Sequence, residues 1–497
     1  MAPPSSLLSD PRPLLAELQQ LRQAVLSEGE TTLARWQPLI RRRSFRASAL
    51  NLAHYLALRK RDIRPLQQAL MPWGLSSLGR SEGRVLPNLD AVIDTLGALC
   101  QAPASALPPR PLPSAFFRGE RCLRHNTRLL LGQAPAERAV RIMVTLPTEA
   151  ASDPGMLRGL LEAGMNCARI NCAHDDPRIW AAMIARLRQT QRDLGRSCQV
   201  LMDLAGPKIR TEQVTTPLGQ ERLFRGDRLL LVRGQPPVGD HYSFQASCTH
   251  PVVLDHLQVG SAVWLDEGRL GCRVEALGPQ GAVLQVTVAR PKGEKLRPGK
   301  GLNFPDVELP LQPLTSKDLL DLDFVAAHTD LVGYSFVQRP ADLDLLIGEL
   351  QGRAGARAGA IGIVAKIETA HALCNLPELI ARAAGRQPFG VMIARGDLAV
   401  EISFPRLAEI QEEILWVCEA AHIPVIWATQ VLENLSQKGI PSRAEITDAA
   451  MAERAECVML NKGPYVTEAV RLLDDVLRRM EAHQRKKTSQ LRALRLW

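Results

Sequence analysis

The sequence predicts an α/β protein built on a (β/α)8 barrel, with a small inserted β-barrel lid domain and an N-terminal α-helical domain. Eight short apolar runs alternate with amphipathic helical stretches after residue 138, and this alternation predicts the barrel. About 90 residues between the third and fourth runs instead show period-two patterns with Gly and Pro. A chain of 497 residues is long enough for a barrel and smaller domains.

The N-terminal region, residues 1–101, is expected to form the helical domain. It is rich in Leu, Ala and Arg at helical spacing, as in LLAELQQLRQAVL, and it lacks the Val and Ile runs of strands. Its role stays open between packing against the barrel, dimerisation and binding a partner, with packing as the default. Residues 102–137 begin with APASALPPRPLP, whose prolines neither continue a helix nor join a sheet. We therefore expect a linker there.

The predicted barrel strands are eight apolar runs, and the helices between them resemble RLAEIQEEILWVCEAA in their spacing. Such a repeat is typical of a TIM barrel, whose active site lies at the carboxyl ends of the strands. We assign residues 138–211 and 301–484 to the barrel. The eight runs are 141–146, 167–171, 199–206, 330–336, 362–368, 389–398, 424–430 and 457–463.

The interruption at residues 212–300 predicts a lid that can close over the site. It contains alternating patterns such as AVWLDEG and AVLQVTVA, which are typical of half-buried strands. Residues 485–497 form a basic C-terminal tail.

The formal charge of +9 does not indicate a nucleic-acid-binding protein. Residues 1–140 hold 19 Lys and Arg against 10 Asp and Glu, whereas the rest of the chain is neutral. We interpret the basic excess as a solvated helix face, and only 4% of the residues are aromatic, which disfavours base stacking. There is no apolar membrane span, no secretory signal and no CxxC pair, so we expect a cytoplasmic protein with reduced cysteines.

Polar side chains recur where the predicted strands end. Two carboxylates on neighbouring strand ends can share one Mg²⁺ (or Mn²⁺), and Lys366 and Arg169 would then face a phosphate. Each residue alone could equally form an ion pair at the barrel rim, but their shared position favours a site. The residues are Arg169, Asn171, Asp203, Lys366, Glu368, Arg395, Asp397 and Thr429, of which Glu368 and Asp397 are the metal candidates.

Other phosphate-binding and hydrolytic motifs do not occur. The sequence contains no GxxxxGK[ST] loop and no strand followed by GxGxxG, which removes support for P-loop kinases, protein kinases and dinucleotide enzymes. It also lacks HExxH and GxSxG.

Residues 138–474 resemble the pyruvate kinase family. The segment LLEAGMNCARINCAH resembles the stretch around the family's phosphate-binding Arg, and MDLAGPKIRT resembles its "D-T-K-G-P-E-I-R-T" motif. AKIETA and ARGDLAVE cover the catalytic Lys and both magnesium ligands, and VIWATQVLENL and SRAEITDAA follow in the family's order. The resemblance covers about two thirds of the chain.

The resemblance implies transfer of a phosphoryl group from phosphoenolpyruvate to ADP in glycolysis, followed by protonation of the enolate to pyruvate. Charge cancellation by a Lys, an Arg and a divalent metal suits that chemistry. It implies catalytic roles for Lys366, Thr429 and Arg169, and Mg²⁺ binding by Glu368 and Asp397. The implied substrate-binding residues are Arg169, Lys366, Arg395, Gly396, Asp397 and Thr429. The implied nucleotide-binding residues are Asn171, His174, Arg210, Lys300 and Asp266.

The family's monovalent-cation site is altered in this sequence. Asn171 and Asp203 persist, but Ala173 replaces a Ser and Leu204 replaces a Thr. Lys208 stands where potassium-dependent members have Glu, and its ammonium could supply the charge that K⁺ otherwise brings. We therefore predict catalysis without a K⁺ requirement.

Further departures concern the nucleotide side and regulation. The family's TIGPAS loop is TLPTEA here, and its SGETAKG loop is shortened to Asn461, Lys462 and Gly463, which affects ADP binding more than phosphoenolpyruvate binding.

The chain stops soon after the eighth helix, so we expect no C-terminal allosteric domain. Because that domain contributes a subunit interface, a homo-oligomer would differ from the usual tetramer.

Two other functions stay open from the sequence. One is a metal-dependent lyase or aldolase acting on pyruvate enolate, because related barrels carry a similar IETA stretch. The other is a catalytically weakened protein that binds phosphoenolpyruvate or nucleotide and regulates a partner. Lys366 two residues before Glu368, together with the inserted lid, favours phosphoryl transfer.

Overall fold

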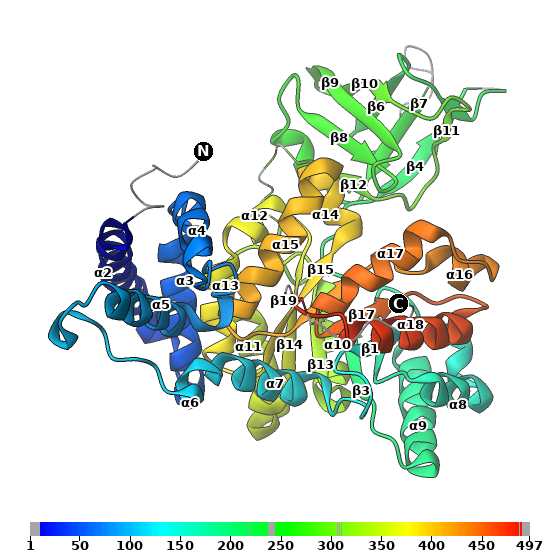
Figure 1. Cartoon of the computed structure of the whole chain (residues 1–497). Coiled ribbons are helices and arrows are strands. Elements are labelled where there is room, and N and C mark those ends of the chain that lie inside the picture. Colours follow the sequence, from blue (N-terminus) through cyan, green and yellow to red (C-terminus); the bar gives the residue numbers. More distant parts are fainter. Residues whose placement is uncertain are drawn as a thin grey trace.

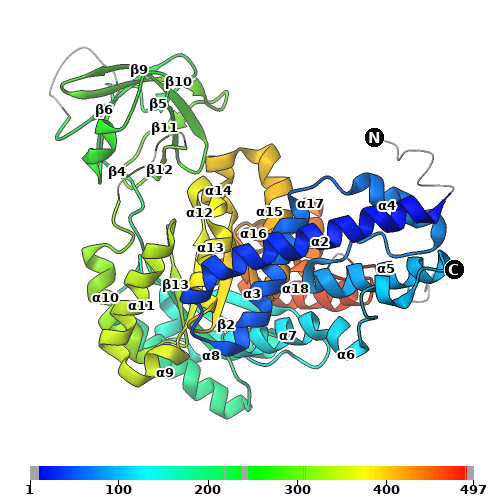
Figure 2. The same ribbon diagram turned by 90° about the vertical axis from the view of Figure 1, so that its left-hand side faces the viewer.

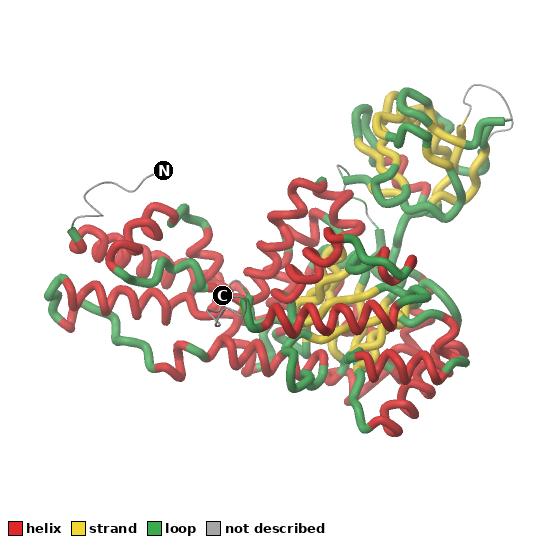
Figure 3. Tube along the Cα trace, turned by 45° about the vertical axis from the view of Figure 1, so that its right-hand side comes forward, coloured by secondary structure: helices red, strands yellow, loops and turns green. Residues whose placement is uncertain are grey.

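The computed structural model describes residues 10–217, 219–236, 244–305, 307, 309, 311–486 and 488–489. Figure 1 shows the three predicted parts: helices at the N-terminus, a central barrel of parallel strands within a ring of helices, and a separate β lid above it. The tube view in Figure 3 shows that strands form the barrel's centre and most of the lid.

The central sheet is a closed eight-stranded parallel barrel, as predicted. Its strands follow the order β1-β17-β16-β15-β14-β13-β3-β2, and all eight lie within the predicted apolar runs. The strands are β1 (Arg141–Thr145), β2 (Cys167–Asn171), β3 (Gln199–Asp203), β13 (Leu331–Tyr334), β14 (Gly362–Ile367), β15 (Phe389–Ala394), β16 (Val425–Ala428) and β17 (Cys457–Leu460).

Capping residues set the ends of the helices that surround the barrel, as α9 shows. Before α9, Asp176 accepts hydrogen bonds from two backbone N–H groups and Pro177 takes the first position, while Gly195 ends the helix at a φ of 62°. The helices are α8 (Pro154–Ala163), α9 (Pro177–Leu194), α10 (Ser316–His328), α11 (Pro340–Ala354), α12 (Ala370–Cys374), α13 (Leu376–Ala384), α14 (Arg395–Ile402), α15 (Phe404–Ala420), α16 (Glu433–Lys438), α17 (Arg443–Met451) and α18 (Val466–Glu481).

The segment 102–137, which the sequence assigned to a linker, includes the short helix α6 (Pro113–Phe116) and the longer α7 (Arg118–Leu131). Leu130 of α7 is buried against the amino ends of the strands. A Cβ at Gly362 or Gly390 would come within 2.5 Å or 2.4 Å of its side chain, so these glycines make room for it. Residues 118–131 of the predicted linker are therefore helical, and their apolar side closes the barrel floor.

The N-terminal helices pack on one side of the barrel, as Figure 2 shows. Arg42 donates to the carbonyl of Gln387 at 2.6 Å, and Asn51 donates to that of Ala420 at 2.8 Å. His422 ties both parts together, with Nδ1 2.8 Å from Ser48 Oγ. The helices are α2 (Pro11–Trp36), α3 (Arg46–Arg59), α4 (Arg64–Leu70) and α5 (Val85–Leu99).

The inserted domain has its own apolar core and a seven-stranded sheet of order β12-β8-β9-β10-β6-β7-β4. It stands above the carboxyl ends of the barrel strands (Figures 1 and 2). Its sheet begins at 211 and includes 302–303, slightly beyond the predicted 212–300. The strands are β4 (Thr211–Thr215), β5 (Arg222–Leu223), β6 (Arg228–Val232), β7 (Phe244–Cys248), β8 (Ala262–Leu265), β9 (Leu270–Gly278), β10 (Gly281–Val288), β11 (Glu294–Lys295) and β12 (Leu302–Asn303).

After α18 the chain forms a small hairpin of β18 (Gln484–Arg485) and β19 (Thr488–Ser489). Lys486 in its turn donates to the carbonyl of Arg454 at 2.9 Å, so the hairpin lies beside the start of β17. The rest of the predicted basic tail, residues 490–497, lies outside the described residues. Within the part of the chain that is described, no helix has the length and apolar character to cross a membrane.

Candidate active site

Two cations meet around one carboxylate at the carboxyl ends of β2, β3 and β14. Arg169 donates from Nε to Asp203 Oδ2 at 2.9 Å and from Nη1 to Thr145 Oγ1 at 3.0 Å. Lys366 Nζ lies 3.5 Å from the same Asp203 oxygen. The carboxylate therefore holds a guanidinium and an ammonium side by side, an arrangement suited to a phosphoryl group.

The charges of this group are maintained despite burial. Burial alone would raise the pKa of Asp203, but Lys366 and Arg169 outweigh it, so the pKa lies below its usual range. Burial would likewise lower the pKa of Lys366, but Asp203 and Glu368 hold its proton and raise the pKa. Lys366 is thus a permanent cation at neutral pH.

Ser335 belongs to the same cluster and was not among the predicted residues. Lys366 Nζ donates to Ser335 Oγ at 2.7 Å, and this hydroxyl donates to the carbonyl of Leu204 at 2.7 Å. The sequence carried a usable signal, because Ser335 directly follows β13, just as Glu368 follows β14 and Thr429 follows β16. The hydroxyl fixes the direction of the Lys366 side chain.

Glu368 lies on the other side of Lys366. Its Oε1 is 3.0 Å from Lys366 Nζ, and its Oε2 accepts a hydrogen bond from the backbone N–H of Phe336 at 2.6 Å. Burial and the nearby negative charge of Asp397 raise its pKa, against the influence of Lys366. Two carboxylates that repel each other in a buried place are stabilised by a cation between them.

The residues present fit a hard divalent cation. Glu368 and Asp397 supply carboxylate oxygens, the donors that Mg²⁺ and Mn²⁺ prefer. Among the residues described, no group of three or more His, Cys, Asp or Glu side chains is arranged to hold a metal. Two protein carboxylates leave further positions for water and substrate, which is usual for Mg²⁺.

Thr429 and Gly396 are also brought together, at the ends of β16 and β15. The backbone N–H of Gly396 donates to Thr429 Oγ1 at 3.0 Å. Thr429 has a φ of 68°, a left-handed conformation that is costly for a β-branched residue and is often found at functional sites. Because Gly396 directly precedes Asp397, this hydrogen bond brings the Thr429 hydroxyl to the backbone that carries Asp397.

Arg395, predicted to bind substrate, directs its guanidinium to partners at the end of β16 and on α17. Its guanidinium donates to both carboxylate oxygens of Asp448, at 2.5 and 2.9 Å, and to the carbonyl of Ala428 at 3.0 Å. It also lies 4.7 Å from the centre of the Trp427 ring. These partners occupy its donors, and they make Arg395 a support for the strained turn at Thr429.

A cleft of about 240 Å³ opens beside Arg169 on the side of β1, β2 and β17. Asn171, His174 and Lys462 line it together. Burial and the positive charge of Lys462 lower the pKa of His174, so this imidazole is neutral at pH 7. The side-chain oxygen of Asn171 accepts the backbone N–H of Ala173 at 3.1 Å and shapes the turn that carries His174.

The lid residues predicted for the nucleotide are held mainly within the lid. Lys300 Nζ lies 2.9 Å from Asp266 Oδ1, so these two charges neutralise each other. Arg210 donates to the carbonyl of Gly299 at 3.0 Å, and its charge contributes to lowering the pKa of His174. Within the described structure Arg210 bonds to the lid backbone, whereas Lys300 and Asp266 form their own pair.

Comparison with known families identifies the barrel. The model of the pyruvate kinase barrel domain matches residues 137–470, which is more than half of the chain. The chain belongs to the pyruvate kinase family. This match includes every predicted site residue of the barrel and the whole inserted lid.

Individual pyruvate kinases are similar over the same region. That of Geobacillus stearothermophilus is 33% identical over 69% of this chain, and the match spans 57% of the relative. Those of Methylorubrum extorquens and Dictyostelium discoideum are 32% and 29% identical, over 69% and 72% of this chain and 69% and 70% of theirs. The chain thus spans little more than half of the Geobacillus pyruvate kinase.

The region predicted to form an altered monovalent-cation site contains Lys208. Lys208 Nζ lies 2.8 and 2.9 Å from the two Asp397 oxygens, and within the described structure it forms no ion pair with Asp203. The carbonyl of Leu204, which replaces a Thr carbonyl, accepts the Ser335 hydroxyl. The ammonium therefore lies at the predicted Mg²⁺ ligand rather than beside Asn171 and Asp203.

Proposed function

We propose that this protein is a pyruvate kinase that transfers the phosphoryl group of phosphoenolpyruvate to ADP, giving pyruvate and ATP. The observation that carries the proposal is the position of Lys366, held between Asp203, Glu368 and Ser335 beside Arg169. Phosphoryl transfer requires charge cancellation and positioning more than covalent catalysis, and these residues supply both.

Lys366 and Arg169 would act on the moving phosphoryl group. Both side chains are only 12% exposed, so their charges act in a place from which water is largely excluded. Arg169 would hold the phosphate of the substrate, and Lys366 would stabilise the negative charge of its oxygens during transfer. Asp203 is the positioning residue for both.

Glu368 and Asp397 would hold the divalent cation. When bound, Mg²⁺ would neutralise the carboxylate and enolate oxygens of the substrate. Lys208 would have to move from Asp397 as this site fills, and it is well placed to remain beside the substrate because it lies in the segment that leads to the lid.

Thr429 would act at the other end of the substrate. Its hydroxyl accepts the Gly396 N–H and can donate its own proton to a carboxylate oxygen of the substrate. It also lies at the place from which a proton could reach the methylene carbon of the enolate. ADP would enter by the cleft of Asn171, His174 and Lys462, with Arg210 above it.

A steady-state assay tests the proposal. Pyruvate formation is measured with phosphoenolpyruvate, ADP and Mg²⁺, for the native chain, for Glu368→Gln and for the exposed control Glu409→Gln. We expect about 1 to 10³ turnovers per second for the native chain and the control, and a severe loss for Glu368→Gln. Metal-dependent phosphoenolpyruvate binding without turnover would instead favour a regulatory protein, and cleavage of a longer oxo acid without ADP would favour a lyase.

A further inference from the structure

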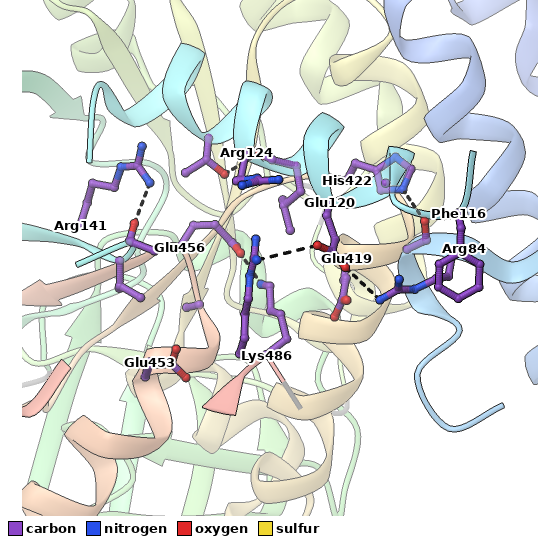
Figure 4. A pocket seen from close by; sticks show the side chains of 18 residues that line it. Arg84, Phe116, Glu120, Arg124, Arg141, Glu419, His422, Glu453, Glu456 and Lys486 are labelled. Atoms are coloured by element: carbon purple, nitrogen blue, oxygen red, sulfur yellow. Dashed lines mark hydrogen bonds and ion pairs between the residues drawn. The ribbon is translucent and has the colours of Figure 1, made fainter. Parts of the chain in front are cut away.

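A second polar pocket lies at the opposite end of the barrel, between α7, the barrel floor and the C-terminal hairpin. Figure 4 shows charged side chains from distant parts of the chain gathered around it. Its volume is about 100 Å³, which equals roughly three water molecules at about 30 Å³ each. It can hold a small ion but no nucleotide. The residues used below are Arg124 of α7, Arg141 of β1, Glu453 and Glu456 before β17, and Arg485 and Lys486 of the hairpin.

Two of the arginines that line this pocket, Arg124 and Arg141, form no ion pair with a carboxylate among the described residues. Arg141 is 7% exposed, and its guanidinium donates to the carbonyls of Gly132 and Ala139, each at 2.7 Å. Among the described residues it has no carboxylate partner, and Arg124 makes no ion pair there either. Lys486, in contrast, is paired with Glu456. A buried guanidinium compensated by carbonyls alone favours an anion nearby.

Glu453 supplies an unused hydrogen-bonding atom. Its side chain lies in the same pocket and is 5% exposed, and its Oε2 has no hydrogen-bond partner among the described residues. Burial raises the pKa of Glu453 to about 8, against the influence of Gln484 and Lys486. A neutral carboxylic acid can donate to an anion, and leaving such a buried group without a hydrogen bond is unfavourable.

We propose that this pocket binds a small oxyanion. Arg124 and Arg141 supply the cations, and Glu453 supplies Oε2, a buried polar atom with no hydrogen-bond partner among the described residues. The pocket lies on the far side of the barrel from Lys366, so it is separate from the proposed substrate site. Binding there does not depend on the proposed pyruvate kinase activity.

The position of the pocket connects it with the active site through three strands. Arg141 begins β1, which ends at Thr145 beside Arg169. Glu456 precedes β17, which ends at Leu460, directly before Asn461 in the cleft. His422 lies before β16, which ends next to Thr429. An anion bound at the barrel floor would therefore lie at the starts of strands whose ends form the site.

Calorimetric titration of the full chain with inorganic phosphate tests the proposal. Arg124→Glu removes a pocket cation, and Arg128→Glu makes the same charge change on the next turn of α7, outside the pocket lining. Phosphate can also bind at Arg169 and Lys366, but neither variant alters that site. We expect one binding event to weaken at least tenfold in Arg124→Glu and to be retained in Arg128→Glu.

The same titration with succinate shows whether the pocket binds carboxylates as well as phosphate. Loss of succinate and phosphate binding in Arg124→Glu would support a general oxyanion pocket, and loss of phosphate binding alone would support a phosphate-selective one. Equal binding of both anions by the two variants would overturn the proposal. Arg124 is exposed, so thermal unfolding without added anion should be the same in both variants and serves as the check on folding.

Discussion

Lys208 Nζ contacts both carboxylate oxygens of Asp397, at 2.8 and 2.9 Å, across 189 residues of sequence. Lys208 lies in the connection between barrel strand β3 and lid strand β4, and Asp397 lies in the first turn of α14. The pair therefore joins the base of the lid to a predicted metal ligand. The Lys208 ammonium thereby places a positive charge of the chain itself at this site.

The first prediction concerns potassium. Because Lys208 already brings positive charge to the site, the native chain should be equally active with KCl and NaCl at constant ionic strength. Lys208→Gln should lower turnover at least tenfold, whereas Lys295→Gln, on the lid and paired with Glu221, should not. Strong activation of the native chain by K⁺ over Na⁺ would contradict this account.

The second prediction separates transfer from enolisation. Lys366→Met should reduce phosphoryl transfer by about 10² to 10³-fold, since the cation beside the moving oxygens is lost. Exchange of the pyruvate methyl protons with D₂O, followed by NMR with Mg²⁺, should be largely retained. Lys438→Met, at an exposed lysine on α16, is the control. An unchanged transfer rate in Lys366→Met would remove the proposed mechanism.

A third prediction compares two ion pairs made by adjacent carboxylates of α18. The Arg138 side chain is fully buried and donates to Asp474 at 2.8 Å, to the Gly164 carbonyl and to Asn166. Arg138→Leu should cost about 3 to 5 kcal/mol in the free energy of unfolding. Arg479→Leu, which removes the exposed pair with Asp475, should leave the free energy of unfolding nearly unchanged. Urea titration measures both, and equal losses would refute the assignment.

The fourth prediction concerns acid stability. Burial lowers the pKa of His422 from 6.5 to about 4, and the imidazole is bonded to Ser48 and to the Gly83 carbonyl. Below pH 6.5 the His422 imidazole binds a proton in the unfolded chain, whereas in the folded chain it does so only near pH 4. The free energy of unfolding therefore decreases as the pH is lowered through this window. The loss should be about 2 kcal/mol at pH 5.

His422→Gln should remove that part of the pH dependence. Urea unfolding at pH 7.5 and pH 5 is compared for the native chain, for His422→Gln and for His125→Gln, an exposed histidine of α7. The difference between the two pH values should shrink only in His422→Gln. The same pH dependence in all three proteins would contradict the assigned protonation state.

The barrel and most of its site could be predicted from the sequence because the evidence is local. Each apolar run contains a barrel strand. Lys366 lies near the end of β14, and Glu368 and Thr429 directly follow β14 and β16. Parallel strands in a closed barrel bring such residues to one edge. The positions of these side chains therefore follow from the order of the elements.

Other features depend on contacts between distant segments and left no local pattern. The apolar side of α7 is explained only by the glycines of β14 and β15 that accommodate Leu130. Arg395 follows a strand like its neighbours, but Asp448 on α17 turns its guanidinium away from the site. The partner of Lys208 could likewise be found only in the folded chain.

The most direct test of the central claim is a ³¹P NMR time course of the purified protein with phosphoenolpyruvate, ADP and Mg²⁺. We predict that the phosphoenolpyruvate signal falls while ATP signals rise in equal amount, and that Asp397→Asn abolishes both changes. Loss of phosphoenolpyruvate with release of inorganic phosphate, or no change in either signal, would contradict phosphoryl transfer at this site.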